Sequence, residues 1–450
     1  MVSDCQAARV GARAGALAGT VVVELGMVMQ VPLAAQMLGD FGANVIKVER
    51  PGTGDILRTL DPVANEAGTM SAYYAALGRN RRTVCLDIKR PEGHEALLRF
   101  LDRADVLLHN FRPGVMERLG LGYSDLEPRN PRLVYAGGFA FGDDGPMASF
   151  PGQDMLAQSF SGFAMSGHGS DEMPRLANPP LMDYATAVSL TQGIMAALIE
   201  RERSGRGQAV TTSLFDVAIC IQTLELASRT MHRSDTGWVR HSMIFRARDG
   251  YIVVLTLFRD NPLKLLCEAF GQADLSREQR FATLELQIAN RAEIQAFFAP
   301  LFASESSADV MARLGKVDIL CSPVNDLSVV IDHPQTRANG TIWEIEIPGH
   351  GRTKVAGNPV RLSRTPAVYA RAPALLGAHN REVLAEFGFD AAEIEALRVA
   401  GVLGEDPRCC CDASSGQPHP DAPGTAEPED MAEAAAAGVR QGAPLASGQA

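Results

Sequence analysis

The chain has 450 residues, 46% hydrophobic and 21% charged, and a formal net charge of −11. This length allows two domains and a large buried core. Residues 405–450 carry eight acids and two bases, a net charge of −6, which leaves −5 for residues 1–404. Because no basic stripe with interleaved aromatic residues occurs, nucleic acid is excluded as an expected partner.

No run of eighteen or more apolar residues occurs, so we expect no membrane-spanning segment and no membrane partner. Residues 1–17 contain Asp4 and no continuous apolar run, which argues against a signal peptide. The eight cysteines show no paired spacing in the body of the chain, and Cys85 and Cys220 are expected in the core. This pattern indicates a reducing, cytoplasmic compartment. Cys409-Cys410-Cys411 lacks partner ligands, so no metal site is predicted.

Strands and helices alternate along the first part of the chain. A β-branched, nearly continuous apolar run predicts a strand buried on both faces over 20–25. Further strands are predicted over 44–49, 82–88, 105–110, 132–136 and 209–213. Helical periodicity predicts helices over 32–41, 92–103, 184–203 and from residue 215. This order predicts an α/β fold with a parallel sheet and right-handed crossovers.

The character of the sequence changes near residue 243. A hairpin with its turn at Asp249-Gly250 and later helices over 262–270 and 290–315 predict a smaller α+β domain. A second hairpin over 342–356, extended residues to about 374 and a final helix pair to Leu403 follow. The predicted organisation is an N-terminal extension (1–17), a large domain (18–230), a linker with a small domain (231–335), a returning linker with C-terminal helices that pack on the large domain (336–404) and a disordered acidic tail (405–450).

Asp183 precedes the predicted helix over 184–203 and follows Pro179-Pro180, which forbid helix upstream. One interpretation is an N-cap carboxylate that accepts a backbone N–H. The other is a carboxylate nucleophile whose pKa is lowered, and whose charge is kept, by the dipoles of the helix N-terminus. Both interpretations remain open on position alone.

The first turn between strand and helix, residues 26–32, is not G-x-G-x-x-G, and no Walker A sequence occurs, which argues against a nicotinamide site. Four basic residues instead follow predicted strands or open short helices: Arg50, Lys89, Arg112 and Arg118. Each alone is typical of a solvated surface charge. Ligands of open α/β sheets bind beyond the carboxyl ends of the strands, so the four together predict a polyphosphate clamp.

Ordered motifs over residues 18–403 resemble the family III CoA-transferases. This CaiB/BaiF-type group includes formyl-CoA:oxalate transferase, the carnitine CoA-transferases and the α-methylacyl-CoA racemases. The likeness lies in residues 42–51 with Gly54-Asp55, 79–82, 86–89, 105–114, 117–120, 130–132, 204–208 and 377–380. The resemblance implies a Rossmann-like large domain, a small α+β domain and two chains interlocked like rings in a homodimer.

The resemblance places the nucleophilic aspartate on Asp183. The CoA contacts that it implies fall on Met29, Gln30, Arg50, Leu86, Lys89, Asn110, Phe111, Arg112 and Arg118. No cofactor is expected to be bound permanently, because coenzyme A and acyl-CoA are substrates. The other substrate that the resemblance implies is a small carboxylic acid.

The racemases of this group place a histidine directly before an aspartate, in a turn upstream of the second catalytic aspartate. Here Gln153 precedes Asp154, and glutamine cannot exchange a proton at neutral pH. His168, the nearest other histidine, lies in a Gly-Ser loop. The oxalate-type transferases carry a glycine-rich loop where residues 236–242 hold one glycine, so a different acyl pocket is expected. Within it, Arg240 and His241 are either partners of a second substrate carboxylate or ordinary linker charges.

These residues together predict a CoA-transferase in which Asp183 forms an aspartyl anhydride and then an aspartyl-CoA thioester. Backbone N–H groups near the helix start or at Gly137-Gly138 are candidates for holding the oxyanions. The alternatives are an acyl-CoA racemase or isomerase of the same group and a CoA-binding homologue without activity.

Overall fold

The computed structural model describes residues 15–165, 173–232, 238–256 and 258–410. Most of the predicted N-terminal extension, His168, residues 236–237, and the predicted tail from Cys411 onward therefore lie outside the described residues.

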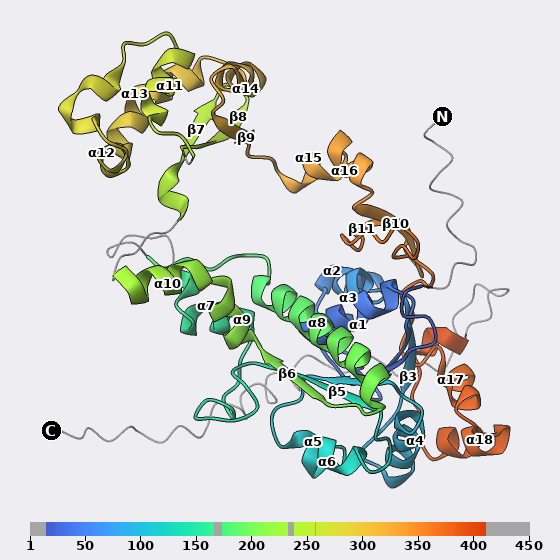
Figure 1. Cartoon of the computed structure of the whole chain (residues 1–450). Helices are drawn as coiled ribbons and strands as arrows, with labels where there is room; N and C mark the ends of the chain where they lie inside the picture. Colours follow the sequence, from blue (N-terminus) through green and yellow to red (C-terminus); the bar gives the residue numbers. More distant parts are fainter. Residues whose placement is uncertain (1–14, 166–172, 233–237, 257, 411–450) are drawn as a thin grey trace.

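A six-stranded parallel sheet forms the centre of the larger lobe (Figure 1). Its strands are β1 (Val21–Glu24), β2 (Asn44–Glu49), β3 (Arg81–Cys85), β4 (Val106–His109), β5 (Val134–Phe139) and β6 (Ala209–Ser213). They run in the order β3-β2-β1-β4-β5-β6, so the winding of the chain reverses between β1 and β4. The prediction of a parallel α/β sheet is confirmed.

Helices pack on both faces of this sheet, which explains the nearly continuous apolar run that forms β1. On one face, Val22 and Val106 pack with α1 (Gln30–Asp40) and α8 (Leu181–Ser204). On the other face, Val23 and Leu107 pack with a second set of helices. This set is α4 (Pro91–Leu101), α5 (Val115–Arg118), α6 (Tyr123–Leu126), α17 (Asn380–Glu386) and α18 (Ala391–Val399).

Two further helices pack beside the start of α8: α7 (Asp154–Phe160) and α9 (Leu214–Ile221). The next helix, α10 (Thr223–His232), contacts α9. Cys85 is buried as predicted, but Cys220 is exposed, so the prediction that Cys220 is a core residue is wrong. The reason is the orientation of α9, which buries Leu214, Val217 and Ala218 and leaves Cys220 on its outer side.

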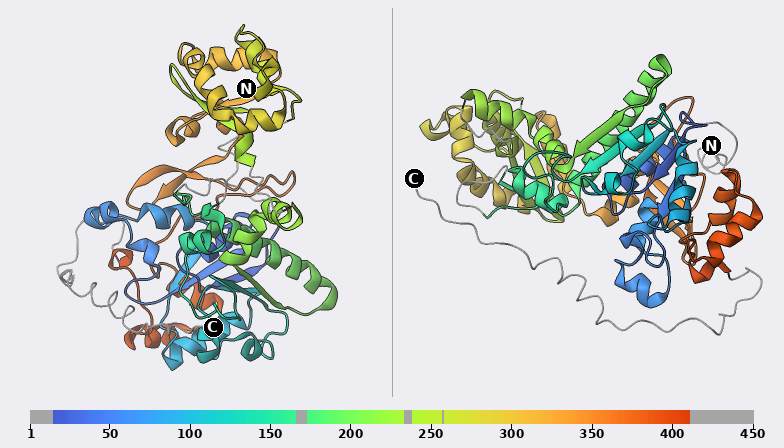
Figure 2. Two further views of the ribbon diagram at one scale, coloured as in Figure 1. Left: turned by 90° about the vertical axis from the view of Figure 1, so that its left-hand side faces the viewer. Right: turned by 90° about the horizontal axis from the view of Figure 1, so that it is seen from below.

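A second lobe stands apart from the larger one (Figure 2). Its antiparallel sheet contains β7 (Ser242–Ala247), β8 (Gly250–Leu255) and β9 (Leu320–Pro323). Its helices are α11 (Pro262–Ala269), α12 (Leu284–Ala289), α13 (Arg291–Ala303) and α14 (Ser307–Lys316). The predicted hairpin is confirmed, but Ala247 pairs with Gly250, so its turn residues are Arg248 and Asp249, one position before the predicted Asp249-Gly250 turn. The fully buried Phe298 and Phe302 belong to a separate hydrophobic core.

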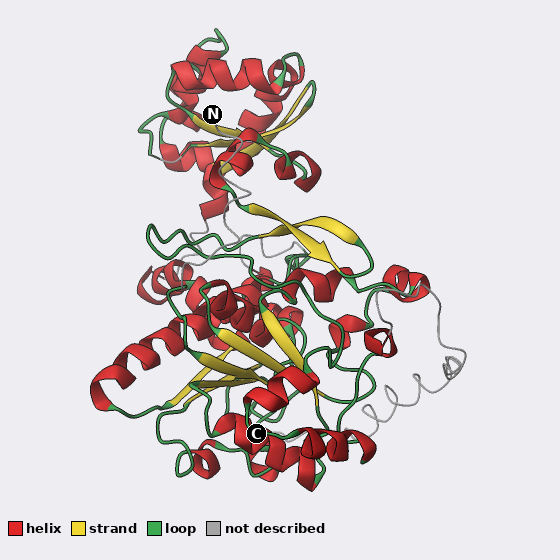
Figure 3. Cartoon of the chain, turned by 90° about the vertical axis from the view of Figure 1, so that its right-hand side faces the viewer, coloured by secondary structure: helices red, strands yellow, loops and turns green. Residues whose placement is uncertain are grey.

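The chain returns through α15 (Leu327–Ile331), α16 (Pro334–Asn339) and the hairpin of β10 (Ile342–Ile347) and β11 (Gly351–Ala356). This hairpin lies between the two lobes (Figure 3). It packs on Leu57, Met70 and α3 (Ala72–Leu77), which follows the short helix α2 (Pro62–Ala67). Beyond it, the N–H of Asp406 donates to the carbonyl of Leu376 at 2.8 Å, so the chain is still attached to the larger lobe where the predicted tail begins. None of the described helices combines the length and the apolar character needed to cross a membrane.

Candidate active site

Asp183 lies in the first turn of α8, not before it. The helix begins at Leu181 with Pro180 at the N-cap position, so the N-cap interpretation of Asp183 is wrong. Proline is tolerated there because the first helical turn leaves backbone N–H groups unpaired anyway. The apolar face predicted for this helix is buried, with Ala187, Leu190 and Ile194 all at 0% exposure. Asp183 therefore sits on a helix that is anchored in the core.

A buried carboxylate from α7 fixes the start of α8. Asp154, 5% exposed, accepts the backbone N–H of Asp183 through Oδ2 at 2.9 Å. Its Oδ1 accepts from Nε2 of Gln158, whose Oε1 accepts the N–H of Ala177 at 2.8 Å. Asp154 and Asp183 are thus adjacent in space although they are 29 residues apart in the sequence.

The electrostatic environment of Asp183 is the reverse of the one expected from its helix position. Burial, and then the negative charge of Asp154, raise the pKa of the Asp183 carboxyl from 3.8 to about 7. The prediction of a pKa lowered by helix dipoles is therefore wrong, because loss of solvation outweighs the dipoles at this site. A carboxyl that titrates near neutral pH inside a protein is typical of a functional group.

The structure also gives the positions of Gln153, which stands where the racemases have a histidine, and of Gly137-Gly138, the pair expected to hold oxyanions. Gln153 is exposed at the N-cap position of α7, where its side chain makes no capping hydrogen bond. Gly137 and Gly138 lie inside β5 and pair with β4 and β6, so the expectation of an oxyanion-binding loop there is wrong.

The loops after β1 and β4 meet at the point where the sheet reverses its winding. Asn110 accepts the N–H of Met27 at 3.0 Å and donates to the carbonyl of Met27 at 2.8 Å. Gln30 opens α1, is 7% exposed, and its Oε1 has no partner among the described residues. A Cβ added to Gly138 would lie 2.8 Å from that oxygen, so the Gln30 amide lies directly against Gly138 and would have to shift if this residue carried a side chain.

The four predicted clamp residues occupy the carboxyl edge of the parallel sheet. Arg50 follows β2, Lys89 follows β3, and Arg112 and Arg118 lie on the turn and short helix after β4. All four side chains are exposed and form no ion pair among the described residues, so their charges are available to a ligand.

The remaining predicted CoA contacts differ in exposure. Phe111 is partly buried against the core and stacks on His109 with ring centroids 6.4 Å apart. Leu86 is 1% exposed and belongs to the core, so its side chain cannot reach a ligand and it could offer only backbone atoms.

A cavity of about 640 Å³ connects the loop after β1 with the start of α8. Met29 and Tyr184, the neighbour of Asp183, both line it. The other walls come from α1, from residues 61–79 and from the β10–β11 hairpin. The size is within the range of small-molecule sites and its walls are mostly apolar.

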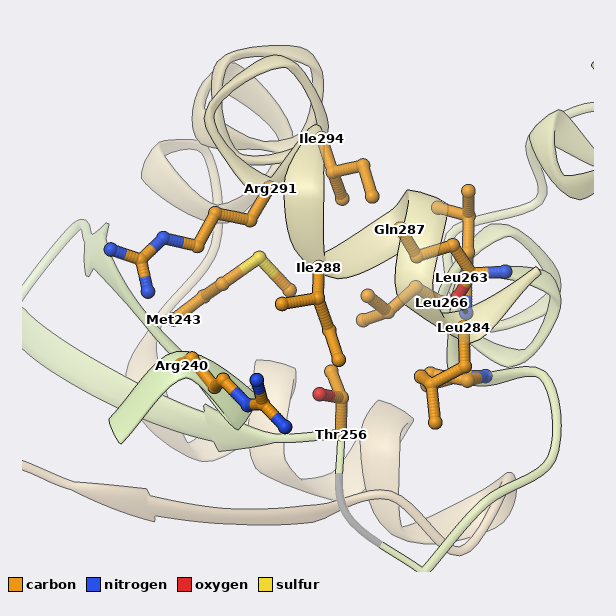
Figure 4. A pocket seen from close by; sticks show the side chains of 11 residues that line it. Arg240, Met243, Thr256, Leu263, Leu266, Leu284, Gln287, Ile288, Arg291 and Ile294 are labelled. Atoms are coloured by element: carbon orange, nitrogen blue, oxygen red, sulfur yellow. Dashed lines mark hydrogen bonds between the residues drawn. The ribbon is translucent and has the colours of Figure 1, made fainter. Parts of the chain in front are cut away.

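Arg240 and His241 lie just before β7 in the second lobe, away from Asp183. Arg240 lines a separate cavity in the second lobe, of about 20 Å³, which has room for about one water molecule (Figure 4). Burial, and then the charge of Arg240, lower the pKa of His241. A single chain does not bring these two residues to Asp183, because α8 and β7 belong to different lobes (Figure 1). Among the described residues no cluster of three or more metal-binding side chains occurs.

The family comparison agrees with this geometry. A family model described as CoA-transferase family III matches residues 17–380. The chain belongs to this family. Succinyl-CoA:mesaconate CoA-transferase of Haloarcula marismortui is 33% identical to this family III enzyme, over 84% of the chain and 97% of the relative. Succinyl-CoA:glutarate CoA-transferase of Mus musculus is 30% identical, over 89% of the chain and 92% of the relative.

Solved structures of similar proteins have the same fold as this family III enzyme. The crystal structure of Rv3272 from Mycobacterium tuberculosis superposes with a TM-score of 0.72 at 32% identity. The match covers 82% of this chain and 99% of that one. A CaiB/BaiF family protein from Brucella suis gives a TM-score of 0.74 at 28% identity, over 83% of this chain and 100% of that one.

Sequence reasoning missed Gln158 and Tyr184. Gln158 stands four residues after Asp154, a spacing that places the two side chains on one face of a helix and was available as a signal. Tyr184 gave no signal, because its place in the cavity depends on how α8 packs against α1.

Proposed function

We propose that this family III CoA-transferase moves CoA from an acyl-CoA donor to a free carboxylic acid, with Asp183 as the nucleophile. The observation that carries the proposal is the partly buried Asp183 carboxyl beside the cavity that Met29 and Tyr184 line. The reversal point of the sheet, where ligands of doubly wound folds bind, supplies Met29. The names of the relatives, which pair two carboxylic acids, support the same reaction class.

The raised pKa suits a carboxylate nucleophile. With a pKa of about 7, Asp183 is ionised in a large fraction of molecules at neutral pH. It is also more basic, and less strongly hydrated, than an exposed aspartate, and both properties favour attack on a thioester carbonyl. Asp154 serves as a positioning residue, because it holds the N–H of Asp183 and repels its charge.

The proposed reaction exchanges bonds of similar energy. An oxygen of Asp183 attacks the thioester carbonyl, the C–S bond breaks, and CoA leaves as the thiolate with the bonding electrons. The thiolate then attacks the aspartyl carbonyl of the mixed anhydride, which releases the donor acid as its carboxylate and leaves an aspartyl-CoA thioester. The acceptor carboxylate attacks this thioester, and the freed thiolate attacks the acceptor carbonyl of the new anhydride. Asp183 is regenerated, and water must be excluded while either intermediate exists.

CoA would lie along the carboxyl edge of the sheet. Its phosphates would meet four positive charges that form no ion pair in the described part of the chain, those of Arg50, Lys89, Arg112 and Arg118. The partly exposed Phe111 provides an aromatic face. The apolar cavity beside Tyr184 would take the acyl group. Because this cavity is larger than a two-carbon acid requires, acyl groups longer than oxalyl or formyl are the expected substrates.

The proposed assembly is a homodimer with interlocked chains. Large apolar side chains are exposed on the helices around α8 in the single chain, where water would otherwise contact them. They include Met155 (52%), Phe160 (56%), Ile199 (60%), Leu224 (56%) and Met231 (74%). In a dimer, Arg240 and His241 of one chain could approach Asp183 of the other. Light scattering after gel filtration tests this, with twice 48.1 kDa expected.

The experiment that tests the reaction is intact-protein mass spectrometry after incubation with a panel of acyl-CoAs, with hydroxylamine as a trap. We expect one adduct that maps to the peptide around Asp183, and no adduct in Asp183→Asn. Entry of isotope-labelled free acid into a CoA ester would then identify the acceptor. Exchange of an α-hydrogen for solvent deuterium without an adduct would instead assign a racemase. CoA binding with neither result would assign a binding protein.

A further inference from the structure

The loop between β1 and α1 contains a strained residue. Val28 has φ of +66°, a left-handed backbone conformation that β-branched residues rarely adopt. Its side chain is 42% exposed, so packing of the side chain does not hold it in place. A conformation of this kind persists only where surrounding contacts impose it.

Side chains from three other segments hold this loop by its backbone. Asp55 accepts the N–H of Val28 at 3.1 Å, and Asn110 both accepts from and donates to Met27. Lys47 on β2 donates to the carbonyl of Gly26 at 2.8 Å. Residues 26–28 are therefore fixed at consecutive peptide groups, although the side chains that fix them are far away in the sequence.

Asp55 is itself held by a buried cluster of charges. Its Oδ2 lies 2.9 Å from Nζ of Lys47, which also contacts Glu24 at 2.8 Å. Glu24 in turn pairs with Arg81 at 3.0 Å, and all four side chains are at most 1% exposed. Buried ion pairs of this kind add little net stability compared with an apolar core, so their presence calls for another explanation.

We propose that Asp55, braced by Lys47, is a positioning residue that keeps residues 26–28 in their strained shape and so presents Met29 and Gln30 to the bound acyl-CoA. Three observations support this role. Met29 lines the cavity next to Tyr184. Among the described residues, the buried Oε1 of Gln30 has no partner, and no side chain caps the N-terminus of α1. Asn110, for which the resemblance implied a CoA contact, uses both ends of its amide on Met27. The inference rests on the proposed function, because the loop is assigned to the CoA site.

The test compares Asp55→Asn with the double variant Asp55→Asn/Val28→Gly. In the single variant an NH2 group faces either Lys47 or Val28. The first orientation removes the contact with Lys47 that braces residue 55, and the second removes the hydrogen bond to the N–H of Val28. We expect kcat to fall by roughly 10- to 100-fold, the size of effect that a misplacement of about 1 Å produces. Glycine adopts positive φ without strain, so the second substitution should recover at least roughly a fifth of the wild-type kcat.

The matched control is Asp274→Asn in the second lobe. Like Asp55, Asp274 caps a 3₁₀ helix by accepting the N–H two residues later at 3.1 Å. This control should leave kcat and the affinity for CoA unchanged. If Asp55→Asn does not fold, Asn110→Ala with and without Val28→Gly carries the same test, because it frees Met27 and leaves the buried charges intact.

Two readouts separate this inference from the proposed reaction. Calorimetric titration with free CoA needs no transferase activity, and the single variant should weaken CoA binding at least roughly 5-fold, with recovery in the double variant. The positioning role of Asp55 would be overturned if kcat and CoA affinity fell in Asp55→Asn only as much as the lower melting temperature explains, and if Val28→Gly restored neither. The wild-type protein could also form no aspartyl adduct while Asp55→Asn still weakens CoA binding and the double variant restores it. That result would refute the proposed reaction and leave the positioning role of Asp55 standing.

Discussion

Replacing Asp183 with asparagine should stabilise the protein at neutral pH while it abolishes transfer. The carboxyl is protonated more readily in the folded chain, since burial and then Asp154 raise its pKa from 3.8 to about 7. A carboxyl with a raised pKa adds nothing below pH 4, where folded and unfolded states are both protonated. As pH rises from 4 to 7, the unfolded state releases its proton first, and the folded state loses stability.

The magnitude follows from the size of the shift. About three pKa units correspond to at most about 4 kcal/mol above pH 7. Partial exposure of the side chain reduces this value, so an effect of about 2 kcal/mol is expected. For a lobe of this size the melting temperature of Asp183→Asn should exceed that of the wild type by roughly 4–8 °C at pH 8. The same difference should shrink toward zero at pH 4.

The assay is thermal melting of both proteins by scanning fluorimetry in matched buffers from pH 4 to 8.5. Activity is measured on the same samples, and the variant should retain less than roughly a tenth of wild-type turnover because an amide is a poor nucleophile. A difference in melting temperature that does not change with pH would refute the raised pKa. A stabilised Asp183→Asn variant that still transfers CoA would refute the assignment of Asp183 as the nucleophile.

Three further predictions concern neighbouring features. Asp154→Asn removes the charge that repels Asp183 and keeps an acceptor for its N–H, so the ascending limb of kcat/KM against pH should move to lower pH; a move upward would contradict the assignment. Arg112→Ala should raise KM for acyl-CoA by roughly 10-fold with kcat within about 2-fold, whereas Arg277→Ala, an exposed arginine of the second lobe, should change neither. Gly207→Ala should lower the melting temperature, because the added Cβ would lie 2.0 Å from the carbonyl oxygen of Leu133. The control is Gly315→Ala, where a Cβ would meet open space. Equal melting temperatures of the two variants would contradict the packing argument.

The sequence by itself determined the parallel α/β architecture. Strands such as β1, predicted over 20–25 and found at Val21–Glu24, are recognisable because burial on both faces demands a nearly continuous apolar run. The β7–β8 hairpin was also predictable, since turn chemistry is local, but strand pairing extends to Gly250 and places the turn one residue earlier than predicted, at Arg248-Asp249. The family motifs singled out Asp183 and the four basic residues that follow strands or open a short helix.

Only the tertiary structure decided the environment of those residues. The pKa of Asp183 depends on burial and on Asp154, which lies 29 residues away and reaches it only because α7 packs beside α8. Asp55 and Lys47 look like ordinary surface charges in the sequence, yet they are buried together under the loop that carries Val28. Hydrogen bonding, solvation and charge coupling act through space over a few ångströms. Spacing along the chain therefore identifies candidate residues, and the packing of distant segments sets what those residues can do.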